Sequence, residues 1–137
     1  MDPSESQDKR AASRFTLEGR VASFGYAFRG LALVARSQHN AWIHAVATVA
    51  VVTLGLIFSV SRMEWCVLVL AIGAVWIAEA LNTALELLAD AVSLEAHPLV
   101  GQAKDAAAGG VLIAAIASAL VGVLVLAPHC LRILGVG

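Results

Sequence analysis

The fold of this chain is decided by residues 78–90, which read AEALNTALELLAD. Four polar side chains recur there at intervals of three and four residues: Glu79, Asn82, Glu86 and Asp90. On a helix, at 100° per residue, these four positions fall within about 80° of one another, and the opposite side is apolar. The segment therefore predicts a helix that carries one narrow polar face.

The composition around this segment is that of a membrane protein. Of the 137 residues, 60% are hydrophobic and only 14% are charged, which argues against a water-soluble enzyme and against a disordered chain. Nine Lys and Arg against ten Asp and Glu give a formal net charge of −1, so no general positive field exists to hold nucleic acid. We expect an all-α membrane protein with no nucleic-acid partner.

Hydropathy divides the chain into a tail, one amphipathic helix and three spans. Residues 1–14 are polar without apolar periodicity, which predicts a disordered tail. Residues 15–36 carry apolar side chains at helical spacing with arginines off that stripe, as in a helix lying on the membrane surface. Long apolar stretches predict spans at about 41–60, 65–89 and 106–127, the last closed by Pro128, with a polar connection at 90–105. Residues 15–137 thus form one membrane domain.

Basic residues set the expected orientation of these spans. Six of the nine Lys and Arg precede the first span, so the positive-inside rule places the N-terminus in the cytoplasm. The connection at residues 90–105 follows two spans later and therefore lies on the same side, where ATP is available. We expect the chemistry on that side.

The carboxylates of the polar face have different depths and therefore different explanations. A carboxylate inside a bilayer costs a few kcal/mol, so an intramembrane Glu79 indicates function. The alternative, a helix end that emerges into water, fits Asp90 and Glu86 but leaves Glu79 too deep. Clustered carboxylates either bind a hard divalent cation or supply a general base. Glu79 and Glu86 are about 10 Å apart by helical rise, too far to chelate one ion directly, so each has a separate role or partners on other helices.

A second polar segment precedes the third span and reads GQAKDAAAGG at residues 101–110. Lys104 suits a phosphate, and Asp105 suits a metal ion or a ribose hydroxyl. The alternative is a membrane-anchoring lysine followed by small residues that let helices pack closely. The sequence contains no GxxxxGK[ST] motif, so a nucleotide site here is not a P-loop.

Together the two segments resemble the ExxNTAxE…D…AKD signature of the small prokaryotic integral-membrane diacylglycerol and undecaprenol kinases. The resemblance covers roughly residues 24–128 and includes GYAFRG at 25–30 and QHNAWIH at 38–44. One departure concerns the metal, because the family's metal-binding glutamate falls on Gln38 here, a neutral and poorer Mg²⁺ ligand. The 38–44 segment is more similar to the undecaprenol-kinase branch.

This resemblance implies a bacterial inner-membrane lipid kinase that transfers the γ-phosphate of ATP, with Mg²⁺, to the hydroxyl of diacylglycerol or undecaprenol. It implies a homotrimer of three-span subunits, with active sites shared between neighbours at the cytoplasmic boundary. Glu79 would be the general base, Asn82 would orient the reacting groups, and Glu86 would hold the metal. The other implied site residues are Gln38 as a weak metal contact, Lys104 at the phosphates, Asp105 at the nucleotide, Glu95, His97 and Tyr26 as weaker nucleotide contacts, and Asp90 and Arg29.

Two other functions remain open from the residues alone. A small proton-coupled transporter would also explain an intramembrane Glu79, although it leaves Lys104 and Asp105 without a role. A non-catalytic membrane subunit of the same fold would be consistent with the neutral Gln38. ATP-dependent labelling of a lipid extract separates these classes.

Overall fold

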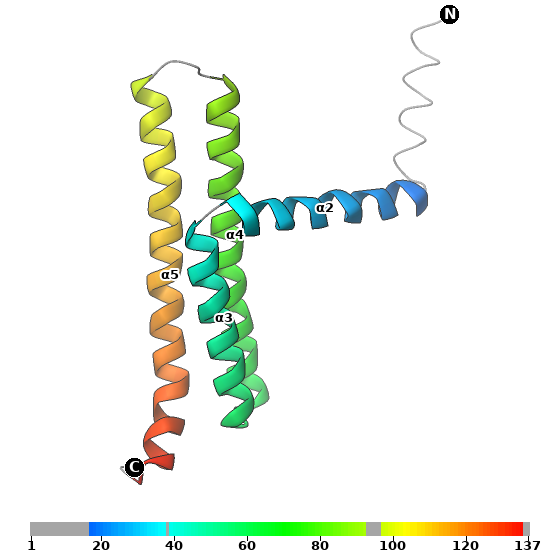
Figure 1. The fold of residues 1–137 in the computed structure, drawn as a ribbon. Helices are drawn as coiled ribbons and strands as arrows, with labels where there is room; N and C mark the ends of the chain where they lie inside the picture. The colour runs from blue at the N-terminus through cyan, green and yellow to red at the C-terminus, as the bar shows by residue number, and fades with distance from the viewer. Residues whose placement is uncertain (1–16, 38, 93–96, 136–137) are drawn as a thin grey trace, which may run out of the picture. The chain divides into compact units, whose positions relative to one another are not determined.

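The computed structural model describes residues 17–37, 39–92 and 97–135 of the chain. All regular structure in these residues is helical: α2 (Leu17–Ser37), α3 (His39–Ile57), α4 (Arg62–Val92) and α5 (Pro98–Ile133) (Figure 1). The all-α fold class is therefore confirmed. The tail predicted at residues 1–14 lies outside the described residues. Contacts divide the chain after Leu33 into two units, so α2 is described apart from the bundle of α3, α4 and α5.

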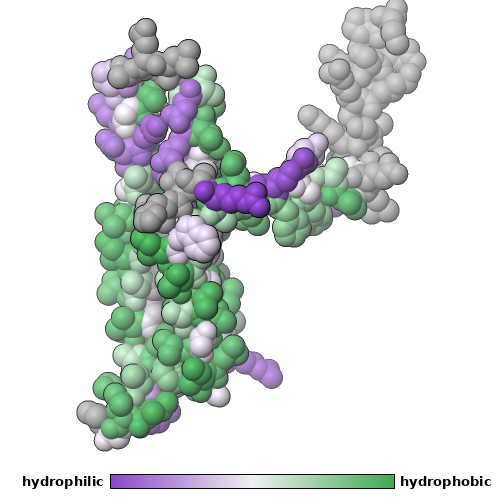
Figure 2. Space-filling model, viewed as in Figure 1, coloured by the Kyte–Doolittle hydropathy of each residue, from purple (hydrophilic) through white to green (hydrophobic). Residues whose placement is uncertain are grey.

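Helix α2 has a hydrophilic side and a hydrophobic side along its length (Figure 2). Its aromatic side chains are exposed, with Phe24 at 67% and Phe28 at 69% of their surface accessible. Large apolar side chains exposed in this way suit lipid, while arginines such as Arg36 in the last turn suit headgroup phosphates. Within the described residues the helix agrees with the one predicted over residues 15–36 and continues one residue further, to Ser37.

Two helices of the bundle, α4 with 31 residues and α5 with 36, are long and apolar enough to cross a membrane. At 1.5 Å per residue they extend over about 46 and 54 Å, more than the roughly 30 Å of a hydrocarbon core. Helix α3 has 19 residues and is about 28 Å long, close to the minimum for a crossing. Hydrophilic residues gather near the connection between α4 and α5, and the rest of the visible bundle surface is largely hydrophobic (Figure 2).

The connection between α4 and α5 is much shorter than the polar segment predicted at residues 90–105. Helix α4 continues to Val92 and α5 begins at Pro98, so helix replaces most of the expected loop. His97 caps α5, because its Nδ1 accepts a hydrogen bond of 3.3 Å from the backbone N–H of Leu99. Proline is also favoured in the first turn of a helix, so Pro98 is a second signal for the start of α5. Polar residues surround this signal, and for that reason the segment was predicted as a connection.

Helix α5 does not end at Pro128, contrary to the prediction, and continues to Ile133. Proline removes one backbone hydrogen bond and crowds the preceding turn, but membrane helices tolerate this defect through local adjustment and neighbouring groups. The extension carries His129, whose Nε2 lies 2.9 Å from Glu64 Oε1 and whose ring stacks on Phe58. These contacts hold the last turns of α5 against the turn between α3 and α4.

A tight turn joins α3 to α4 and ends α3 before the predicted boundary at residue 60. Ser59 adopts a left-handed backbone conformation with a φ of 51°, which a helix cannot continue through. Helix α4 then begins with a capping box, in which Ser61 Oγ accepts from the N–H of Glu64 and Glu64 Oε2 accepts from the N–H of Ser61. Local signals in these few residues therefore set both helix ends.

A small apolar core closes the bundle beside this turn. It consists of the buried side chains of Val60, Leu68 and Leu126, with Phe58 and Trp65 packed against them. Nearer the middle of the bundle, Ser118 Oγ on α5 donates a hydrogen bond of 2.9 Å to the carbonyl of Ala71 on α4. The two long helices are thus joined by packing at one end and by a polar contact further along.

Gly55 is the glycine of this bundle where an added methyl group meets the closest neighbour. A Cβ there would lie 2.8 Å from Cη2 of the Trp65 ring. We expect Gly55→Ala to lower the free energy of unfolding by about 1–3 kcal/mol, the usual cost of overpacking, measured by thermal denaturation in detergent. Gly101→Ala is the control, since nothing lies within 4 Å of a Cβ at that position. Equal stability of the two variants would show that the Trp65 ring moves aside without cost.

Candidate functional site

A cavity of about 230 Å³ lies between α3, α4 and α5 and contains most of the polar face of α4. Its polar lining comes from His44 on α3 and from Glu79, Asn82 and Glu86 on α4. Its apolar lining consists of Ile43, Ala108, Val111, Leu112 and Ala115. The structure thus brings together three of the four polar side chains that share this face and adds a histidine from another helix.

Glu79 is almost completely buried in this cavity, with 1% of its surface exposed. Neither of its carboxylate oxygens has a hydrogen-bond partner among the described residues. His44 Nε2 lies 3.9 Å from Glu79 Oε2, beyond hydrogen-bond distance, and is itself buried and unpaired within the described part of the chain. Buried polar groups are nearly always paired, so the unpaired oxygens of Glu79 make this cavity a candidate ligand site.

Asn82 connects the turn of Glu79 to that of Glu86. It is buried, and its Nδ2 donates a hydrogen bond of 3.3 Å to Glu86 Oε1. Its Oδ1 is buried and has no partner in the residues that the structure describes, so this oxygen is available to a ligand. Asn82 therefore fixes one oxygen of Glu86 and offers its own oxygen to the cavity.

Asp90, the fourth member of the polar face, lies outside this cavity. Its Oδ1 pairs with Lys104 Nζ at 2.9 Å, which joins the end of α4 to the start of α5. The Asp90 and Lys104 side chains remain 70% and 38% exposed, so the pair is weak and a phosphate can compete with Asp90 for the lysine. Asp105, the next residue, is exposed on α5.

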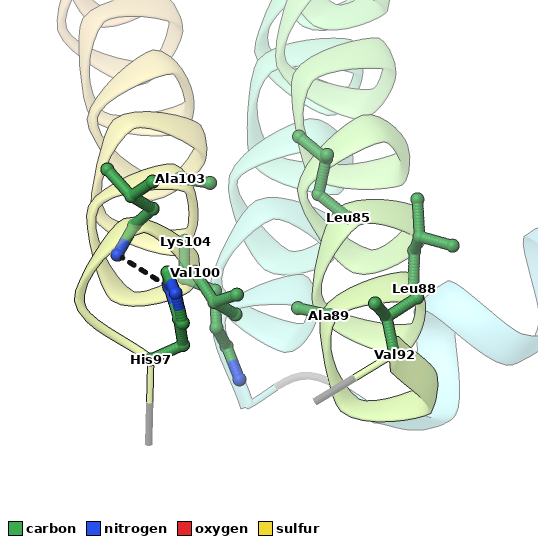
Figure 3. Close-up of a pocket in the computed structure, with 9 residues that line it drawn as sticks. Leu85, Leu88, Ala89, Val92, His97, Val100, Ala103 and Lys104 are labelled. Atoms are coloured by element: carbon green, nitrogen blue, oxygen red, sulfur yellow. Dashed lines mark hydrogen bonds between the residues drawn. The ribbon is translucent and has the colours of Figure 1, made fainter. Parts of the chain in front are cut away.

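A groove of about 510 Å³ lies between the same ends of α4 and α5 (Figure 3). It is lined by Leu85, Leu88, Ala89 and Val92 of α4 and by His97, Leu99, Val100, Ala103 and Lys104. Among these lining residues only His97 and Lys104 are polar. The groove therefore suits a ligand that has both a charged part and an apolar ring, such as a nucleotide.

Two of the predicted site residues lie on α2 and contact each other. The guanidinium carbon of Arg29 lies 4.6 Å from the ring centroid of Tyr26, a cation–π contact, and Arg29 Nε donates to the carbonyl of Gly25 at 3.3 Å. This pair belongs to the other unit and is described by itself. Gln38 and Glu95, predicted as metal and nucleotide contacts, lie outside the described residues.

The cavity offers few ligands for a metal ion. Residues 17–37, 39–92 and 97–135 contain no group of three or more metal-ligating side chains. Glu86 does offer a carboxylate beside the unpaired Oδ1 of Asn82. Mg²⁺ in phosphoryl-transfer sites is commonly held by one or two carboxylates together with substrate phosphates. This donor set therefore fits a metal that is bound jointly with a nucleotide.

A known protein family matches the part of the chain that forms this cavity. Residues 25–126 match the family model described as prokaryotic diacylglycerol kinase. The chain belongs to the prokaryotic diacylglycerol kinase family. The matched range contains all of α3 and α4 and most of α5, and so the cavity between them. Membership confirms the predicted class of enzyme, an ATP-dependent lipid kinase, and leaves the transporter alternative without support.

Curated relatives of this kinase differ in the lipid that their names give. Undecaprenol kinase from Bacillus subtilis (strain 168) is 41% identical over 106 residues, which cover 77% of this chain and 86% of that protein. Diacylglycerol kinase from Synechocystis sp. is 40% identical over 115 residues, covering 83% of this chain and 66% of that protein. Diacylglycerol kinase from Escherichia coli (strain K12) is 29% identical over 116 residues, covering 80% and 89%. Nearly equal identity to relatives of both names does not separate the two lipids.

His44 is the residue of the kinase cavity that the sequence analysis did not assign. Its signal was present, since it is the only titratable side chain between residues 41 and 60, and an ionisable residue inside a span is a functional candidate by default. The sequence does not show, however, that α3 places it opposite Glu79.

Proposed function

We propose that this kinase transfers the γ-phosphate of ATP to the hydroxyl group of a membrane lipid alcohol, either diacylglycerol or undecaprenol. The observation that carries the proposal is the carboxylate of Glu79, which is buried in a cavity between three helices and has no partner in the part of the chain that the structure describes. Burying such a group is costly, so its presence in an apolar bundle points to a chemical use. A base for the lipid hydroxyl is the use that fits a lipid kinase.

Glu79 is the proposed general base, and Asn82 orients the groups around it. A lipid hydroxyl in the cavity gives its proton to a Glu79 oxygen as its own oxygen bonds to the γ-phosphorus, and the bond from that phosphorus to the ADP oxygen breaks. The hydrogen bond from Asn82 to Glu86 holds the neighbouring carboxylate in place. Phosphoryl transfer depends on positioning and charge neutralisation more than on covalent catalysis, so this small set of residues suffices.

Glu86 is the proposed metal ligand, and Mg²⁺ is the proposed metal. Phosphoryl transfer needs a metal ion, which neutralises charge on the β- and γ-phosphates. Glu86 would hold the metal, with its Oε1 fixed by Asn82, and Gln38 would add one amide oxygen as a weak contact. Because Gln38 is neutral, Glu86 would supply most of the negative charge that this chain offers to the metal.

The proposed nucleotide contacts lie around the start of α5. Lys104 exchanges Asp90 for the phosphates of ATP, because the ion pair between them is exposed and weak. Asp105 contacts the nucleotide on its ribose side. His97 and Glu95 are further proposed nucleotide contacts. Tyr26, which belongs to α2 and is considered by itself, is also a proposed nucleotide contact, and Arg29 is proposed as a further site residue without an assigned ligand.

We propose that the N-terminus and the active site face the cytoplasm of a bacterial inner membrane. In this arrangement α3 crosses the membrane as α4 and α5 do, and α2 lies on the membrane surface. The excess of basic residues before α3 supports this orientation, and the length of α3 supports a crossing. A homotrimer with shared active sites is the proposed assembly, and the oxygens of Glu79 and Asn82 that have no partner within the described helices could accept hydrogen bonds from a neighbouring subunit. The lipid then arrives within the bilayer and ATP arrives from water.

Competitive labelling tests the function and the substrate together. The purified protein in detergent is given radiolabelled ATP and an equal mixture of undecaprenol and diacylglycerol, and the products are separated by thin-layer chromatography. We expect one labelled lipid phosphate to predominate and to be lost in the Glu79→Gln variant. Absence of label in both lipids would contradict the proposed function.

Gln38 makes a further prediction about the metal. A neutral amide supplies one oxygen and no charge, so we expect Gln38→Glu to lower the half-saturating concentration of free Mg²⁺ several-fold. Initial rates against free Mg²⁺ at fixed ATP measure this for both proteins, and Gln102→Glu, another change of glutamine to glutamate, controls for added charge. Superimposable curves for wild type and Gln38→Glu would place Gln38 away from the metal.

A further inference from the structure

We propose that His44 is a positioning residue for Glu79: its Nε2–H holds one carboxylate oxygen and so directs the other at the lipid hydroxyl. This inference rests on the proposed role of Glu79 as the base. It adds a polar residue of α3 to the base and its orienting residue on α4.

The geometry of the pair carries the proposal. His44 Nε2 lies 3.9 Å from Glu79 Oε2, and the two side chains are 14% and 1% exposed. Both groups lack hydrogen-bond partners among the described residues although they face one cavity. The distance is about 1 Å longer than a hydrogen bond, and catalytic hydrogen bonds are often long before the substrate binds and tighten in the substrate complex.

Two side chains in the lining of the cavity can donate hydrogen bonds, His44 and Asn82. From α4 the cavity receives the carboxylates of Glu79 and Glu86 and the amide of Asn82, which donates one of its two N–H hydrogens to Glu86. From α5 it receives Ala108, Val111, Leu112 and Ala115, none of which titrates or donates from its side chain. Within this described lining, Asn82 is directed at Glu86, and the imidazole is the donor that comes within 4 Å of a Glu79 oxygen.

A polar clamp between α3 and α4 fixes the backbone beside the pair. Trp76 Nε1 donates a hydrogen bond of 3.1 Å to Thr48 Oγ1, which donates one of 2.7 Å to the carbonyl of His44. Thr48 is one helical turn after His44, and Trp76 is nearly one turn before Glu79. The clamp thus sets the approach of the two helices at the level where the imidazole meets the carboxylate.

A matched pair of substitutions tests the role of the imidazole. The amide nitrogen of glutamine reaches the position of Nε2, whereas that of asparagine reaches only as far as Nδ1. We expect His44→Gln to keep kcat within about threefold of wild type and His44→Asn to lower kcat by about tenfold or more, with KM for ATP unchanged within about twofold in both. Ser118→Ala, which removes another hydrogen bond from the same bundle, is the control and keeps wild-type kcat. Equal kcat values for His44→Gln and His44→Asn would overturn the proposal.

The clamp supplies a second variant that leaves the imidazole intact. Thr48→Val conserves the shape of the side chain and removes both hydrogen bonds of the hydroxyl. We expect a fall in kcat of about threefold to tenfold with KM for ATP unchanged, since only the alignment of the pair is affected. An unchanged kcat would show that the clamp does not position His44.

Infrared difference spectroscopy of the folded protein separates this inference from the proposed function. Subtracting the spectrum of Glu79→Gln from that of wild type isolates the carboxyl band of Glu79 without any lipid substrate. The same subtraction in the His44→Gln and His44→Asn backgrounds should leave the band in place for glutamine and shift it for asparagine. A carboxyl band that stays at the same frequency in both variants would refute the contact between His44 and Glu79. A protein that shows the expected shift but transfers no label to lipid would refute only the kinase assignment.

Discussion

Glu79→Gln is expected to lower kcat by a factor on the order of 10²–10⁴, because the amide keeps the shape of the side chain but cannot accept the proton of the lipid hydroxyl. The effect should fall on kcat and kcat/KM together, since the lost interaction acts in the transition state. Steady-state phosphate transfer at saturating ATP and lipid measures both constants.

This variant should remain folded, because the carboxylate has no hydrogen-bond partner among the described residues that the amide would lose. Size-exclusion chromatography and circular dichroism of the purified variant check this. Retention of more than about a tenth of wild-type kcat, a loss of under ~1.4 kcal/mol in transition-state stabilisation, would remove Glu79 from the role of base.

Glu86→Gln is expected to lower kcat/KM for ATP by a factor on the order of 10², because glutamine offers the metal one neutral oxygen in place of a charged carboxylate. Its amide can still meet Asn82, so the loss reflects the metal and not the fold. Raising free Mg²⁺ should restore part of the activity, and rates measured over a range of Mg²⁺ concentrations show this.

The matched control for Glu86 lies on the same helix. Glu64→Gln also neutralises a carboxylate of α4, but Glu64 contacts His129 and Ser61 at the opposite end of the bundle. We expect it to reduce thermal stability and to leave kcat/KM near that of wild type. The metal would be assigned to other residues if kcat/KM for ATP fell no further in Glu86→Gln than in Glu64→Gln. The same conclusion would follow if added Mg²⁺ did not raise the activity of Glu86→Gln.

The ends of the helices show where sequence reasoning succeeds and fails for this fold. The polar face of α4 is predictable because helical geometry alone aligns positions 79, 82 and 86. The bounds of α5 are not, because hydropathy reports the part of a helix that prefers lipid and not the whole helix. At one end the capping by His97 starts α5 early, and at the other a membrane helix absorbs the defect of Pro128.

The contacts of the candidate site also fall into two classes, those that the sequence predicts and those that it does not. Contacts within one helix, such as Asn82 to Glu86, follow from a spacing of four residues. Contacts between helices, such as His44 to Glu79, depend on how α3 rotates and crosses α4, which the sequence pattern does not specify. The pairing of Lys104 with Asp90 likewise requires the short connection between α4 and α5.

On the proposed role of Glu79 as the base, its burial serves the reaction and lowers the stability of the helical bundle. A carboxylate enclosed in an apolar bundle without a partner among the described residues weakens that bundle, and a leucine of similar size would pack there more favourably. Selection for thermal stability alone would therefore favour the replacement of Glu79 by an apolar residue. On the proposed role of Glu79 as the base, we expect related chains that lack a carboxylate at this position to be inactive as kinases.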